Sequence, residues 1–109
     1  MDQKLAEKVE QARLLEASLY NILMQKQTLQ QQLDEIENAL RVLDNIGPGE
    51  KVYKMVGNIL IEKDKSKLVE DLKSLKELLE VRISSLDKQE QRLKEKLEKL
   101  QEELQKLIK

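Results

Sequence analysis

Apolar side chains recur every three or four residues along two long stretches of this chain, one on each side of a short central segment. The first stretch runs from Leu5 to Leu43 and the second from Val69 to Leu107. A 3-4 spacing sustained over several heptads keeps one seam of a helix facing a partner helix as the two supercoil. Each stretch therefore predicts a coiled-coil helix, roughly 60 Å long at ~1.5 Å per residue.

The two seams mirror each other about the central segment. The first comprises Leu5, Lys8, Ala12, Leu15, Leu19, Ile22, Lys26, Leu29, Leu33, Ile36, Leu40 and Leu43. The second comprises Val69, Leu72, Lys76, Leu79, Ile83, Leu86, Glu90, Leu93, Leu97, Leu100, Leu104 and Leu107. Folding the chain back at its centre places Leu5 opposite Leu107, and Leu43 opposite Val69. The pattern predicts one antiparallel coiled coil with both chain termini at its far tip.

Four charged residues interrupt the seams: Lys8, Lys26, Lys76 and Glu90. In one interpretation their long stems pack in the seam while their heads reach water. In the other, Lys26 and Glu90, one turn apart across the predicted pairing, specify the register of the two helices at some cost in stability. Both interpretations are structural, and neither implies chemistry.

The central segment from Val52 to Ile61 reads as a β-hairpin, because two runs rich in β-branched residues flank Gly57-Asn58. Val56 then pairs with Ile59, and Tyr53 with Glu62. Both faces of this hairpin are apolar, and an isolated two-stranded hairpin is marginal in water. We therefore predict that it mediates oligomerisation through Val52, Tyr53, Met55, Val56, Ile59, Leu60 and Ile61.

Local stop signals set the expected boundaries of a single domain over residues 1–109. Gly47-Pro48-Gly49 ends the first helix, and Asp64 or Ser66 caps the second. The expected elements are a helix over residues 1–46, a loop and hairpin over 47–63, and a helix over 64–109. The predicted fold is mainly α, two long helices forming an antiparallel coiled coil and joined by one β-hairpin that assembles into an oligomeric β-barrel.

Further apolar residues lie off the seams near the hairpin, where a two-helix contact does not need them. They are Ala39, Val42, Ile46, Leu68, Leu75, Leu78 and Val81. They either thicken the local core or pack beneath a multi-chain β-assembly.

Composition excludes several classes of function. The chain has 20 basic and 21 acidic side chains, so no net field attracts nucleic acid or anionic lipid. Cysteine and histidine are both absent, which excludes disulfides and the usual catalytic pairs and transition-metal ligands. No run of apolar residues is long enough for a membrane span. We expect a cytoplasmic protein that is not an enzyme and uses no cofactor or metal. Its abundance of lysine and glutamate hints at a thermophilic source.

The order of helix, Gly/Pro break, hairpin and leucine-repeat helix resembles the β-class subunit of prefoldin, archaeal type. The specific part of the resemblance is Val52-Tyr53-Lys54-x-Val56-Gly57 and the Leu/Ile strand that follows it. The resemblance implies a hexamer of two α-class and four β-class subunits with a β-barrel platform. It also implies an ATP-independent chaperone whose coiled-coil tips capture unfolded proteins and pass them to a group II chaperonin.

The tips are then the predicted site for unfolded client proteins, because helix ends fray and expose seam leucines intermittently. The candidate residues are Met1, Leu5, Val9, Leu104, Leu107 and Ile108. Two other functions remain open. One is a structural coiled-coil scaffold or tether without client binding. The other is a nucleic-acid accessory protein, which the balanced charge and the scarcity of aromatic residues oppose.

Overall fold

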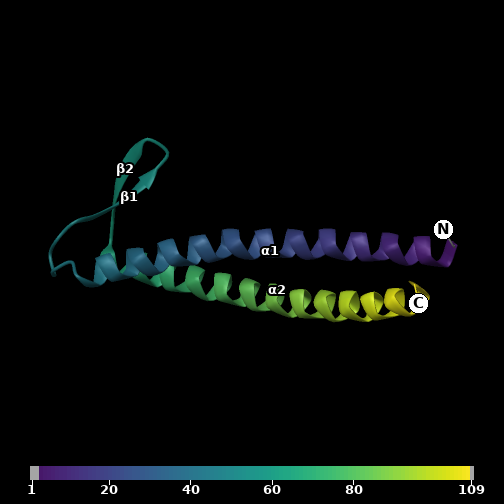
Figure 1. Cartoon of the computed structure of the whole chain (residues 1–109). Helices are drawn as coiled ribbons and strands as arrows, with labels where there is room; N and C mark the ends of the chain where they lie inside the picture. Colours follow the sequence, from purple (N-terminus) through teal and green to yellow (C-terminus); the bar gives the residue numbers. More distant parts are fainter. Residues whose placement is uncertain (1–2, 109) are drawn as a thin grey trace. The chain divides into compact units, whose positions relative to one another are not determined.

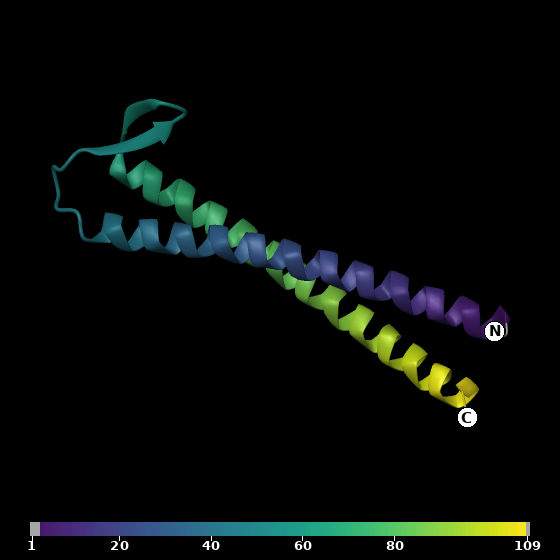
Figure 2. The ribbon, with the colours of Figure 1, turned by 45° about the horizontal axis from the view of Figure 1, so that its top comes forward.

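The computed structural model describes residues 3–108 of the chain (Figure 1). Helix α1 spans Gln3–Asp44, strands β1 and β2 span Val52–Val56 and Ile59–Lys63, and helix α2 spans Lys65–Ile108. The residues group into two compact units. The terminal unit contains residues 3–28 of α1 and 83–108 of α2, and the hairpin unit contains residues 29–82. In Figure 2 the N-terminal turns of α1, in purple, lie beside the last turns of α2, in yellow.

Burial in both units follows the predicted seams. Every seam position of α1 is buried or half-buried, and so is every seam position of α2 except Leu107. The core of the terminal unit contains Ile22, Leu86 and Leu100. That of the hairpin unit contains Leu33, Ile36, Leu43, Val52 and Leu79. Among the described residues the buried set is wholly apolar, as expected for a coiled-coil seam.

A tight turn separates α1 from the hairpin. The helix ends at Asp44 rather than at the expected Ile46, because Asn45 and Ile46 only continue it as hydrogen-bonded turns. The amide of Glu50 donates to the carbonyl of Gly47 over 3.3 Å. Pro48 and Gly49, with φ of +92° at Gly49, occupy the two central positions of a type II turn, which requires a positive φ at the second.

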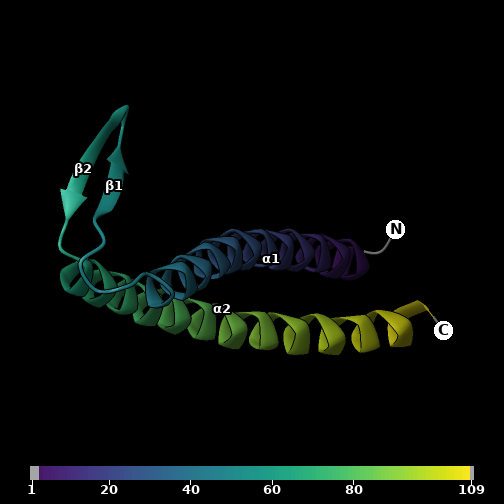
Figure 3. The same cartoon turned by 90° about the vertical axis from the view of Figure 1, so that its left-hand side faces the viewer.

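The hairpin has the predicted register. Val56 pairs with Ile59, Met55 with Leu60 and, at the open end, Val52 with Lys63. Figure 3 shows the two antiparallel strands and their short connection. Gly57 has a φ of +59°, the conformation that a primed two-residue turn requires at its first position.

Helix α2 begins directly after the hairpin. The carbonyl of Asp64 accepts the first helical hydrogen bond, from the amide of Leu68 at 2.9 Å, so Asp64 rather than Ser66 stands at the N-cap position. The ammonium group of Lys65 donates to the carbonyl of Ile46 over 2.8 Å. This bond satisfies a carbonyl just beyond the end of α1 and ties the two helix ends of the hairpin unit together.

Candidate functional site

Six of the seven hairpin residues predicted to mediate oligomerisation are exposed. They are Tyr53, Met55, Val56, Ile59, Leu60 and Ile61. Side chains alternate across a strand, so this apolar surface covers both faces of the hairpin. Neither strand has a second neighbour within the described chain, and both therefore present free hydrogen-bonding edges.

The seventh residue, Val52, has a different position. Only 7% of its surface is exposed, and it is the one hairpin residue in the core of the hairpin unit. It therefore anchors the base of β1 to its own chain. The other six predicted residues remain exposed on the hairpin.

The predicted tip residues lie in the terminal unit, where they divide into two groups. Leu5 and Leu104 are half-buried in the seam, whereas Val9, Leu107 and Ile108 are exposed. Met1 lies outside the described residues. The exposed residues of this end therefore offer apolar surface without any opening of the seam.

An ion pair links the two helices at this end. The ammonium group of Lys8 lies 2.6 Å from Oε2 of Glu103, and this hydrogen bond lowers the pKa of the Glu103 carboxyl. The Lys8 side chain is 23% exposed, so its stem packs in the seam while its head reaches an acidic partner. The contact also agrees with the predicted antiparallel pairing near Leu5 and Leu107.

Part of the exposed apolar surface of the terminal unit was missed because it lies outside the predicted seams and tips. Tyr20, Leu23 and Met24 are exposed on α1, together with Leu14. The missed three stand at i, i+3 and i+4, so they share one helix face, and this spacing outside the seam is the signal that identifies them. Between Val81 and Leu107, by contrast, α2 exposes no large apolar side chain. Away from the last turn of α2, the exposed large apolar residues of the terminal unit belong to α1.

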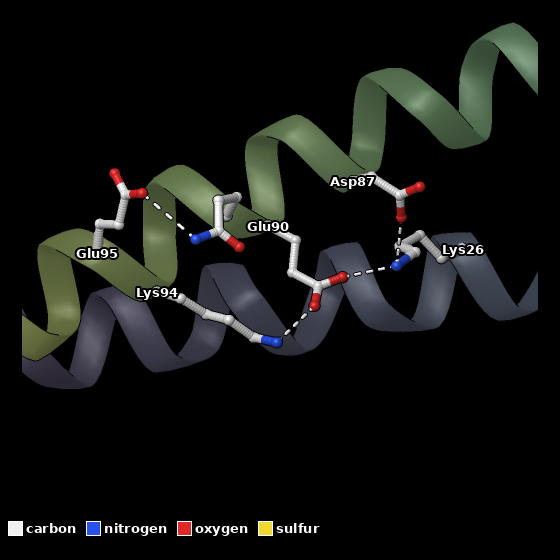
Figure 4. Close-up of polar contacts among 6 residues, drawn as sticks. Lys26, Asp87, Glu90, Lys94 and Glu95 are labelled. Atoms are coloured by element: carbon white, nitrogen blue, oxygen red, sulfur yellow. Dashed lines mark hydrogen bonds and ion pairs between the residues drawn. The ribbon is translucent and has the colours of Figure 1, made fainter.

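A charged cluster occupies the seam of the terminal unit (Figure 4). The ammonium group of Lys26 lies 2.5 Å from Oδ1 of Asp87 and 2.6 Å from Oε1 of Glu90. Lys94 approaches the other carboxylate oxygen of Glu90 at 2.7 Å. The contact between Lys26 and Glu90 on which the second interpretation of the seam charges rests is thus present, with Asp87 and Lys94 as additional partners. The cluster compensates charge at two seam positions that would otherwise interrupt apolar packing.

These contacts shift two pKa values in opposite directions. Hydrogen bonds from Lys26 and then Lys94 lower the pKa of Glu90 from 4.5 to about 2. Hydrogen bonds to Asp87 and then Glu90 raise the pKa of Lys26 above its ordinary value. Both shifts favour the charged forms in the folded protein. The contribution of Glu90 to stability is therefore complete above pH 4.5 and is lost as the pH falls towards 2.

We expect Glu90→Gln to lower the melting temperature at pH 7, because the amide removes the charge that Lys26 and Lys94 contact. The difference from the unsubstituted protein should shrink as the pH falls from 4.5 towards 2, the range over which the Glu90 carboxyl itself becomes neutral. Thermal melts followed by circular dichroism measure both quantities. Glu95→Gln is the matched control, since within residues 3–108 the Glu95 carboxylate accepts a hydrogen bond from Gln91 on its own helix and forms no ion pair with α1. Equal effects of the two substitutions would contradict the role of the cluster.

Over the part of the chain that the structure describes, no three potential ligands among histidine, cysteine, aspartate and glutamate converge to hold a metal ion. Within the same residues, neither helix has an apolar stretch long enough to cross a membrane.

Comparison with known proteins decides the family. A family model described as "Prefoldin subunit" matches residues 6–109. This chain belongs to the prefoldin subunit family. Prefoldin subunit beta of Pyrobaculum calidifontis is 38% identical over 104 residues, which cover 95% of this chain and 81% of that protein. Its counterpart in Thermococcus onnurineus is 39% identical over 84 residues, covering 77% of this chain and 72% of that protein.

A solved prefoldin structure has the same fold. The crystal structure of the prefoldin beta subunit from Thermococcus strain KS-1 matches with a TM-score of 0.90 and 32% identity, covering 97% of this chain and 93% of that one. The resemblance found in the sequence is confirmed, as is the fold of two long helices joined by a two-stranded hairpin. In a prefoldin subunit the hairpin completes a β-barrel only on oligomerisation. Membership supports a prefoldin-type chaperone role within a hetero-oligomeric complex.

Proposed function

We propose that this prefoldin subunit captures unfolded proteins with the exposed apolar residues at the ends of its helices and passes them to a group II chaperonin. It does so in a hexamer of two α-class and four β-class subunits, in which it is a β-class member. The observation that carries the proposal is the exposure of Val9, Leu107 and Ile108 beside the ion pair of Lys8 and Glu103. An unfolded protein exposes apolar segments, and these side chains offer it apolar contacts.

Several weak contacts suffice for such capture. Once one tip of the oligomer has bound a client, the other tips act at high effective concentration, so avidity exceeds the affinity of any single tip. Each contact is nevertheless weak enough to break, and the client can be released without an energy source. The sequence supports this mode, because no Gly-Lys-Ser/Thr motif follows Gly47-Pro48-Gly49 to bind a nucleotide phosphate.

The test is an aggregation assay. The assembled complex should slow the aggregation of a chemically denatured test protein, to the same extent with and without ATP and magnesium. Addition of a group II chaperonin with ATP should then yield refolded test protein. If the complex assembles but leaves aggregation unchanged, the chain is a structural scaffold. Protection without transfer would retain client capture and reject the chaperonin step.

A further inference from the structure

Helix α2 carries apolar side chains in the hairpin unit that α1 does not cover. Leu75, Leu78 and Val81 are 43%, 48% and 66% exposed, whereas Leu79, between them in the sequence, is only 3% exposed. Three residues along an α-helix turn about 60° short of a full circle. Leu75, Leu78 and Val81 therefore lie successively farther around α2 from the seam, and Val81 lies on the side of α2 opposite α1. A contact between two helices cannot bury it.

The first member of this row lines a groove that adjoins the hairpin. Leu75 lines a groove of about 170 Å³ together with Leu68 and Leu72 of α2. Lys54 of β1 and Lys63 of β2 line the same groove, as do the charged residues Asp64, Lys67 and Asp71. These two lysines share one hairpin face with Ile59 and Ile61, because residues alternate along each strand and Lys54 pairs with Ile61. The exposed row of α2 thus begins where the assembling hairpin meets the helix.

The row also ends within the hairpin unit. Beyond Val81, α2 exposes no large apolar side chain until Leu107 in its last turn. Exposed apolar residues on α2 are therefore confined to the stretch adjoining the hairpin and to the end of the helix. This distribution matches a surface that is covered when the hairpin joins its neighbours in the β-barrel.

We propose that Leu75, Leu78 and Val81 form a helical second part of the subunit interface, covered by the neighbouring subunit of the prefoldin oligomer. A neighbouring hairpin that adds to a free edge of this hairpin brings its own chain alongside the groove. Apolar side chains of that neighbour then bury the row and remove its apolar surface from water. This interface serves assembly, and it does not depend on whether the tips bind clients.

The absence of cysteine makes a direct test possible. Single variants Leu78→Cys and Val81→Cys are prepared in the assembled complex and labelled with a thiol-linked photo-crosslinker. Arg92→Cys is the matched control, because position 92 lies two heptads beyond position 78 on the same helix face and is also exposed. We expect crosslinks to another subunit from positions 78 and 81 and none above background from position 92. Equal yields from all three positions would overturn the proposal.

A second measurement tests the energetic contribution. Leu78→Lys combined with Val81→Lys should raise the dissociation constant of the oligomer at least tenfold, as measured by native mass over a dilution series. The control combines Leu14→Lys with Tyr20→Lys, at two positions that are similarly exposed in the terminal unit. The control should change the dissociation constant of the oligomer less than threefold. Unchanged assembly of the first variant would reject the interface. Crosslinks from positions 78 and 81 that appear only when a denatured protein is added would assign the row to client binding instead, and would also reject it.

Discussion

Replacing Ile59 and Ile61 together with lysine is expected to disperse the oligomer while leaving the helices folded. Both side chains are exposed in the isolated chain, so they contribute little to its own core. We propose that they lie on a hairpin face that neighbouring subunits cover when the β-barrel assembles. Burying an unpaired ammonium group costs several kcal/mol, and every 1.4 kcal/mol changes an equilibrium constant about tenfold. Two such groups should lower the association constant by more than about a thousandfold.

Native mass spectrometry gives the stoichiometry, and far-UV circular dichroism gives the helix content of the same samples. The matched control is Ile59→Val with Ile61→Val, which keeps both positions apolar and β-branched and should preserve the oligomer. An oligomer of unchanged mass in the double lysine variant would show that this hairpin face is not the assembly surface. Loss of helix content in that variant would show that the hairpin also supports the fold of the monomer.

The elements and their pairing could be predicted from the sequence because they rest on local periodicity. A 3-4 apolar spacing places the apolar residues on a single face of a helix. This correctly identified Leu33 and Leu79 as core positions. The hairpin register followed from a two-residue turn with glycine first, which leaves one pairing of Val56 with Ile59. Aligning the two seams placed Lys26 and Glu90 one turn apart, which left their ion pair as one of two interpretations, and the structure contains that contact.

Burial that depends on tertiary or quaternary packing could not be predicted in the same way. Val52 has the same β-branched character as Val56, yet only the first is buried, because it lies at the hairpin base against its own unit. The off-seam apolar residues near the hairpin also differ in burial. Ala39, Ile46 and Leu68 are half-buried, whereas Val42 and Leu78 are exposed. A local apolar count does not distinguish these cases, since it does not say which neighbours are within the chain.

The second large effect is expected when the tips of the two helices are removed. Deleting residues 1–9 together with 103–109 should preserve the oligomer and abolish protection of a denatured test protein. The deletion removes two seam positions from each helix, including Leu5 and Leu104, and it also removes the ion pair of Lys8 and Glu103. The buried seam residues from Ile22 to Leu100 and the whole hairpin remain. Assembly should therefore continue, because the surfaces that mediate it are untouched.

Two substituted variants separate the tip from the rest of the terminal unit. The first combines Val9→Ser, Leu107→Ser and Ile108→Ser, and it removes exposed apolar surface at the tip without shortening either helix. The second combines Tyr20→Ser, Leu23→Ser and Met24→Ser, and it removes exposed apolar surface from the one face of α1 that these three residues share. Capture at the tip requires the first variant to lose protection in the aggregation assay while the second keeps it. The reverse result would assign the client surface to that face of α1. Full protection by both variants and by the deletion would place the client surface outside the terminal unit, on the exposed apolar residues of the hairpin unit.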